Sequence, residues 1–267
     1  MMLIVLGAMA LLLSGLERVP QFRFRPSALF RRYFISDVVY LVTGFIAGGS
    51  AAMAYFIAVS GWLGQSLSLP RLSSAGLSMW VLVPLALVAI DLGNYVAHYS
   101  LHRSDVLWEF HKVHHSIAAL DWLATFRSHI FEQVVRRLIA PVLLILIGFP
   151  LQSALIANAI FIGWTMLNHS NLGVNLRIFE PILITPRLHR LHHVYKTSEK
   201  NLGTVFTVWD QLRGTLVRAE LGNNSILGNG EDSYPQGWLP QLIEPVRKIA
   251  HLHKTSYQHK QRLENPH

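Results

Sequence analysis

Clustered histidines constrain this chain more than any other feature of its sequence. Ten of its fourteen histidines fall within residues 91–132 and residues 168–193. The first block contains the spacings HxxxH and HxxHH, and the second contains another HxxHH. Residues three or four apart share a face of an α-helix, so each motif gathers its imidazoles on one side of a helix. The histidines of these motifs are His98, His102, His111, His114, His115, His189, His192 and His193.

This number of imidazoles predicts a centre of two metal ions. Histidine is the commonest metal ligand and suits iron, zinc, copper and nickel. Four ligands saturate a structural zinc ion, whereas the three motifs supply eight imidazoles. The chain has no cysteine, which excludes disulfides, thiolate-bound zinc and iron–sulfur clusters.

Composition places the chain in a membrane. It is 51% hydrophobic and only 14% charged, which is too apolar for an ordinary soluble domain. The first apolar segment is interpreted as a retained anchor rather than a signal peptide, because Arg18 follows the apolar run and no basic region precedes it. The last apolar segment, residues 138–167, is split by Gly148-Phe149-Pro150, which favours a helical hairpin. The apolar segments are residues 1–16, 38–62, 77–90 and 138–167.

The distribution of charge predicts how these segments are oriented. Residues 17–32 carry five arginines against one glutamate and are expected on the cytoplasmic side, while residues 63–76, with Arg71 as their only charge, are expected on the far side. Every histidine of the motifs then falls on the cytoplasmic side. The net charge of +8 is interpreted as basic loops facing anionic lipid, and nucleic acid is not expected as a partner.

Capping and turn signals predict further helices outside the apolar segments. The helix that starts at residue 77 is expected to continue through His102, and Ser104 or Asp105 is expected to cap the next helix. Thr185-Pro186 is expected to begin a short helix that carries the last motif. Residues 221–237 are predicted to be a loop, and residues 239–252 an amphipathic surface helix. The remaining histidines, in a basic tail at about 251–267, are interpreted as solvated.

In its motifs, the chain resembles the fatty acid hydroxylase/sterol desaturase superfamily, the membrane-bound histidine-box diiron oxygenases. The resemblance covers about residues 91–215. It departs from the family pattern at Ile130, where proline is usual, at Leu202, where an aromatic residue is usual, and at Arg213, where an apolar residue is common. The motifs that carry it are HYSLHR (98–103), LWEFHKVHHS (107–116), RSH (127–129), NHSN (168–171), TPRLHRLHH (185–193), NLG (201–203) and WDQLRGT (209–215).

The resemblance implies an all-α fold, in which polytopic membrane helices lie under a cytosolic helical cap that holds a histidine-rich dimetal centre. Residues 1–267 would form a single integral membrane domain. The implied activity is O2-dependent hydroxylation or desaturation of a C–H bond of a sterol, fatty acyl or related lipid in lipid biosynthesis, at two iron ions. The metal centre itself is the catalytic group, and no separate acid or base is assigned. Neither a haem domain nor a flavin fingerprint is visible, so electrons are expected from a separate electron-transfer protein or a pterin.

The resemblance also extends the set of expected metal ligands. It adds His169 to the eight histidines of the spaced motifs. His129 is a tenth candidate, for which a ligand role and a supporting structural role both stay open. Metal-bound imidazoles usually donate their other N–H to a carboxylate or carbonyl. The carboxylates near enough in sequence, each with an ordinary surface charge as its alternative, are Asp91, Glu109, Asp121, Glu132 and Asp210.

Other polar and aromatic residues near the motifs have open roles. Asn94 and Asn168 are candidates to hold a metal-bound water or are helix-packing amides. The tryptophans are candidates to line the substrate cavity or to form an interfacial belt. These tryptophans are Trp108, Trp122 and Trp164.

Two other classes of function compete with a lipid oxygenase. A zinc-dependent membrane hydrolase of the HExxH type would place a glutamate beside its histidines, but no His-Glu pair occurs in the chain. A metal-binding or transport protein would place ionisable groups inside its spanning helices near the midplane, and the apolar segments lack them.

Overall fold

The computed structural model describes residues 2–264, except residues 27, 29, 67–71, 73–74, 222–224 and 232. The predicted all-α fold is confirmed: in this part of the chain, helices make up the regular structure, and β-pairing is limited to three isolated bridges. Arg71 and the end of the basic tail at residues 265–267 lie outside the described residues.

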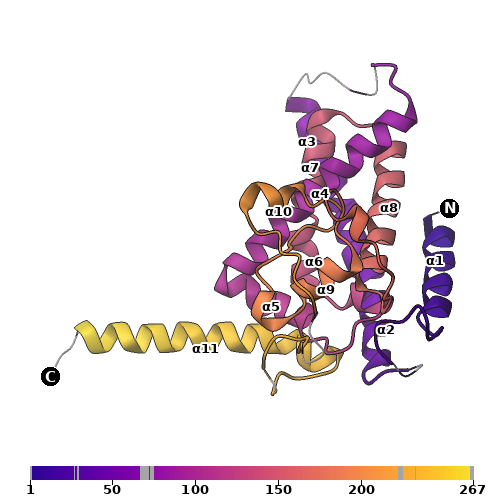
Figure 1. Ribbon diagram of the computed structural model, residues 1–267. Coiled ribbons are helices and arrows are strands. Elements are labelled where there is room, and N and C mark those ends of the chain that lie inside the picture. Colours follow the sequence, from indigo (N-terminus) through magenta and orange to yellow (C-terminus); the bar gives the residue numbers. More distant parts are fainter. Residues whose placement is uncertain are drawn as a thin grey trace.

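Four apolar helices stand side by side (Figure 1): α1 (Met2–Leu16), α4 (Met79–Arg103), α7 (Ile139–Ile147) and α8 (Leu151–His169). Among the described residues, two helices, α4 and α8, are long and apolar enough to cross a membrane. Their outer faces carry large apolar side chains, with Trp80 91% exposed, and such a surface suits lipid rather than water. The predicted span at residues 38–62 is helical but interrupted, as α2 (Phe34–Thr43), a π-helical turn (Gly44–Gly48) and α3 (Gly49–Ser66).

Small residues allow the apolar helices to pack closely. A Cβ placed on Gly93 of α4 would lie 2.7 Å from the Cα of Ala140 on α7, so the two backbones touch. Gly148, at φ 77°, ends α7, and α8 begins three residues later, directly after Pro150, which confirms the predicted hairpin. The core between α4, α7 and α8 contains Ala86, Ala89, Ile90, Leu144, Ala154 and Ala157.

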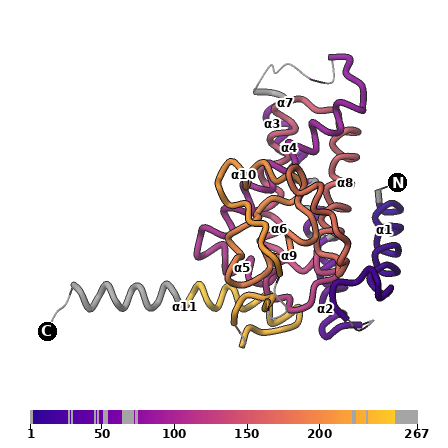
Figure 2. The backbone as a smooth tube through the Cα atoms, in the orientation of Figure 1, coloured from indigo at the N-terminus to yellow at the C-terminus, as the bar shows by residue number. Residues whose placement is uncertain are grey.

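Shorter helices form a cap over one end of these apolar helices. α5 (Asp105–His115) begins where the Ser104 hydroxyl accepts a hydrogen bond from the Leu107 N–H, and α9 (Pro186–His192) begins at Thr185 in the same way, as predicted. α6 (Ile130–Arg136) and α10 (Val208–Arg213) complete the cap. Figure 2 shows the chain between α8 and α10 looping around α9.

The last helix, α11 (Trp238–Glu264), contacts α5 and α2 near its start. It confirms the amphipathic helix predicted at residues 239–252 but continues twelve residues further. Residues 253–264 contain neither glycine nor proline, and Pro266 is the first stop signal, so nothing in the sequence ends the helix earlier.

Candidate metal centre

Nine of the ten candidate histidines come together in two adjoining groups. In each group, one nitrogen from every ring lies within 4.8 Å of the others. Group one consists of His98, His102, His111, His115 and His192, and group two consists of His114, His169, His189 and His193.

The histidines reach the two groups from four helices. α4 and α8 deliver theirs at their C-terminal ends, so the apolar helices themselves carry part of the centre. α5 ends in the doublet His114-His115, and α9 ends at His192 with His193 directly after it. Each doublet divides its two residues between the groups. Consecutive residues on a helix point about 100° apart, so one doublet can serve sites on either side of its helix.

Ring nitrogens within each group are spaced like ligands of one ion. In group one, the Nε2 atoms of His98, His102 and His111 lie 3.1–3.2 Å from one another. In group two, the Nε2 atom of His169 lies 3.1 Å from that of His114 and 3.0 Å from that of His189. Nitrogens bound at about 2.0–2.1 Å from one ion lie about 2.9–3.4 Å apart in tetrahedral or octahedral arrangements. The spacing therefore fits a metal ion in each group.

The opposite nitrogen of five of these rings is anchored by the protein. In each, the Nδ1–H donates to an oxygen 2.8–3.0 Å away, which leaves the Nε2 lone pair directed into the group. The pairs are His98 with the Leu202 carbonyl, His111 with the Glu132 carboxylate, His114 with the Arg127 carbonyl, His169 with the Thr165 carbonyl and His192 with the Lys200 carbonyl.

Several buried nitrogens in the centre have no hydrogen-bond partner among the described residues. These include both ring nitrogens of His115 and the Nε2 of His192. A buried polar atom without a partner is costly, and native structures seldom leave several together. Because His115 and His192 both belong to group one, an ion bound there would give a partner to one nitrogen of His115 and to the Nε2 of His192.

Burial keeps the imidazoles of the cap neutral, which is the form that binds metal. Removal from water lowers the pKa of each ring, and the neighbouring rings lower it further because they disfavour added positive charge. The pKa of His192 falls to about 3. The pKa values that fall well below the usual 6.5 for the same reasons are those of His111, His114, His115, His189 and His193.

The five candidate carboxylates have different roles. Glu132 accepts from His111, as a metal-supporting carboxylate does. Asp91 and Asp210 instead accept from backbone N–H groups of residues 202–206, the loop whose Leu202 carbonyl anchors His98. Glu109 pairs with Lys112, and Asp121 pairs with Arg31.

Three polar residues around the centre hold this loop and Glu132 in place. The Asn94 and Asn168 amides donate to the side chain and the backbone carbonyl of Thr204, respectively. Arg136, which sequence reasoning missed, donates to Glu132 and to Asn94. Its spacing of four residues from Glu132 was the available signal, because oppositely charged residues at that spacing pair on a helix.

Of the three candidate tryptophans, Trp108 adjoins the centre. Its ring centroid lies 5.0 Å from that of His102 and 5.2 Å from that of His115. The indole N–H of Trp122 donates to Ser14 of α1, and that of Trp164 donates to the Ile184 carbonyl in the segment before α9.

His129 lies outside both groups. It caps α6, where its Nδ1 accepts from the Phe131 N–H and its Nε2 lies 3.2 Å from the Leu242 carbonyl. Both of its ring nitrogens therefore have partners within the protein.

Comparison with known proteins agrees with this geometry. Residues 83–215, which include all nine histidines of the two groups, match the family model described as fatty acid hydroxylase. The chain is 34% identical to ornithine lipid hydroxylase of Rhizobium tropici over 62% of its own length and 50% of that protein. It is 30% identical to alkylglycerol monooxygenase of Danio rerio over 50% of its length and 30% of that protein.

The chain thus spans half or less of the length of these curated relatives. No solved structure matches it significantly. The family match and the two relatives, together with the two histidine groups beside the apolar helices, lead to one assignment: the chain belongs to the fatty acid hydroxylase family.

Proposed function

We propose that this chain is a membrane-bound non-haem diiron oxygenase that uses O2 to hydroxylate a C–H bond of a membrane lipid. The observation that carries the proposal is the convergence of nine histidines into two groups beside two helices long enough to cross a bilayer. The names of the relatives, a lipid hydroxylase and an alkylglycerol monooxygenase, support oxygen insertion over desaturation.

The proposed ligand set follows the two groups. The five histidines of group one would hold one ion, and the four of group two would hold the other. His129, with both nitrogens engaged at the start of α6, is proposed as a capping residue instead.

The chemistry explains why a redox-active metal is needed. Hydroxylation converts a C–H bond, O2, two electrons and two protons into an alcohol and water. A bound pair of iron ions would supply that redox chemistry, which zinc cannot. The chain's own residues keep the imidazoles neutral, fix their orientation and exclude water from the centre. The two electrons would come from a separate electron-transfer protein or a reduced pterin, and the lipid would come from the bilayer.

The proposed orientation places the centre on the cytoplasmic side. Residues of the arginine-rich segment lie directly beside the end of α8. Arg23 and Leu172 form an isolated antiparallel β-bridge, and the Phe24 N–H donates to the Asn171 carbonyl at 2.7 Å. The arginine-rich segment and the candidate metal centre therefore share one side of the membrane helices. Arginine-rich loops favour the cytoplasmic side of a membrane.

Metal analysis combined with an isotope experiment tests this function. The full chain, purified in neutral detergent, is expected to contain two iron ions. With a lipid extract, a reductant and isotopically labelled O2, it is expected to yield a lipid that carries one labelled oxygen atom. A zinc-loaded protein that consumes no O2 would rule the proposal out.

Three variants connect that activity to the two groups. His192→Ala and His193→Ala each remove one ligand, from group one and group two respectively, and are expected to lower bound iron and abolish hydroxylation. His129→Asn serves as the matched control, since asparagine also caps helices well, and it is expected to keep both ions. If His129→Asn lost iron while His192→Ala and His193→Ala kept it, the two groups would not be the metal site.

A further inference from the structure

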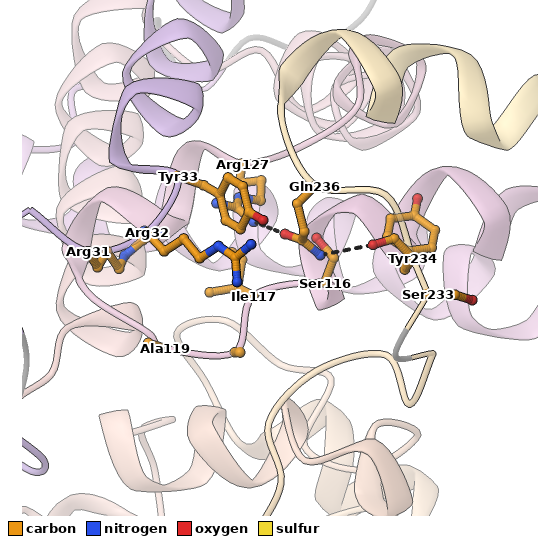
Figure 3. A pocket seen from close by; sticks show the side chains of 11 residues that line it. Arg31, Arg32, Tyr33, Ser116, Ile117, Ala119, Arg127, Ser233, Tyr234 and Gln236 are labelled. Atoms are coloured by element: carbon orange, nitrogen blue, oxygen red, sulfur yellow. Dashed lines mark hydrogen bonds between the residues drawn. The ribbon is translucent and has the colours of Figure 1, made fainter.

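A pocket lined by arginines lies outside the two histidine groups. It has a volume of about 530 Å³ and is formed where the segment before α2, the turn after α5 and the segment before α11 meet. Among the described residues that line it, none is one of the nine histidines of the centre. Figure 3 shows Arg31, Arg32 and Arg127 on one side of this pocket and Ser233 and Tyr234 on the other.

The charge of the pocket is not balanced. The Asp37 carboxylate pairs with Arg31 at 2.5 Å and with Arg127, and Asp121 pairs with Arg31 at 2.7 Å. Arg32 is exposed, and its guanidinium lies 4.9 Å from the centroid of the Tyr33 ring. No carboxylate among the described residues pairs with Arg32, so two carboxylates serve three arginines. The pocket therefore suits an anion.

An apolar pocket adjoins the cationic one. It has a volume of about 570 Å³, shares Arg31 and Tyr33 with the first pocket, and is otherwise lined mainly by Phe30, Phe34 and Ile35. Phe30 is 66% exposed and Ile35 is 77% exposed, so apolar surface is available there. A cationic site next to an apolar one, with Arg31 and Tyr33 lining both, matches an amphiphile with an anionic head rather than a free anion.

The place of the two pockets in the fold also favours a lipid. They lie at the start of α2, an apolar helix, and are lined in part by Arg31 of the arginine-rich segment, on the same side as the metal centre. Cationic side chains at that level of a membrane protein meet lipid headgroups. We propose that the two pockets bind one anionic phospholipid, with its phosphate group beside Arg32 and the first part of its acyl chain against Phe30 and Ile35.

This site is distinct from the metal centre, but it shares Arg127 with the residues that hold the histidines of the centre. The backbone carbonyl of Arg127 accepts the Nδ1–H of His114 at 3.0 Å, while the Arg127 guanidinium lines the cationic pocket. Ser116, which also lines the pocket, directly follows His115. The proposed lipid binds whether or not the protein is an oxygenase, so the two proposals can fail separately.

Isothermal titration of the full chain in neutral detergent tests the site. The probes are dihexanoyl phosphatidylglycerol, dihexanoyl phosphatidylcholine and inorganic phosphate. The phosphatidylglycerol is expected to bind at least about tenfold more tightly than the other two. The quaternary ammonium of phosphatidylcholine is repelled by the unbalanced arginines, and inorganic phosphate lacks the apolar contact. Equal affinity for both lipids would refute recognition of charge. Phosphate binding as tight as the anionic lipid would refute the lipid as ligand.

Ala119 offers a matched pair of variants, because it is exposed and lines the pocket. Ala119→Glu adds a carboxylate opposite Arg32 without removing any hydrogen bond of the native protein, and is expected to weaken phosphatidylglycerol binding about tenfold or more. Ala119→Gln has the same size and no charge, and is expected to bind like the parent protein. Identical affinity of the two variants for phosphatidylglycerol would overturn the proposal.

A second pair tests the cation itself. Arg32→Gln is expected to weaken binding about tenfold. Arg177→Gln removes an arginine that lines neither pocket and only breaks an exposed pair with Glu220, so it is expected to leave binding unchanged. An unchanged unfolding temperature in all four variants verifies that they fold, and unchanged binding in Arg32→Gln would overturn the site.

Discussion

At the scale of single residues, Glu132 is the carboxylate that supports the centre. Its side chain is 1% exposed, and one oxygen accepts from both His111 and Arg136 at 2.8 Å. Glu132→Gln keeps the shape but removes the charge that faces these two donors. Loss of such a supporting carboxylate lowers metal affinity about 10–100-fold. A chelator titration of the purified protein measures the loss. Glu109→Gln, a buried carboxylate paired with Lys112 instead, is expected to retain metal, and equal losses in the two variants would contradict this role.

Residue positions in the centre were predictable to different degrees. Eight of the nine histidines in the two groups follow a local spacing of three or four residues, which is readable without knowledge of the fold, whereas His169 was expected only from the resemblance. The groups that accept the Nδ1–H of these rings follow no such spacing. The carbonyl groups of Leu202 and Lys200 belong to the backbone and leave no signature in the sequence. Asp91 and Glu132 likewise look equivalent in the sequence, and only the tertiary packing decides which one faces a histidine of the two groups.

At the scale of elements, the loop of residues 201–206 holds His98 in place. Asp210 fixes that loop by accepting from the N–H groups of Leu202 and Gly203 at 3.0 and 2.7 Å. Asp210→Asn turns one acceptor into a donor that faces a buried N–H, which costs about 1–3 kcal/mol. We expect the variant to unfold at a lower temperature than the parent protein. We also expect it to lose metal from group one more readily than from group two. Asp105→Asn, at an exposed site, is the control, and equal loss from both groups would argue against a local effect.

The elements themselves were predictable where their signals are local. Ser104 and Thr185 begin helices as their hydroxyls indicate, and Gly148 ends one. The π-helical turn at residues 44–48 and the packing of residues 22–25 beside residues 171–173 were not predictable. Both depend on contacts between segments far apart in the chain, which periodicity does not report.

At the scale of the whole molecule, the two histidine groups join the membrane helices to the cap. Group one connects α4, α5 and α9, and group two connects α5, α8 and α9. A metal ion that binds the folded chain and not the unfolded one stabilises the fold by mass action. Removal of metal by a chelator is therefore expected to lower the unfolding temperature of the entire protein in a single transition. A separate early transition of the cap would instead show that cap and membrane helices fold independently.

The pH dependence of the metal-free protein follows from the same burial. The six histidines of the cap are neutral when folded, with pKa values below 6.5, and regain a pKa near 6.5 when unfolded. Below pH 6.5 the unfolded chain therefore binds more protons, and each such histidine lowers the stability by up to about 1.4 kcal/mol per pH unit. Thermal unfolding of the metal-free chain is expected to be insensitive to pH above about 7 and to shift steeply downward from pH 6.5 to 5. The metal-loaded protein is expected to resist acid further, because bound ions compete with protons for the same nitrogens. An unfolding temperature of the metal-free protein that stays constant down to pH 5 would mean that water reaches these rings, and the enclosed centre would have to be abandoned.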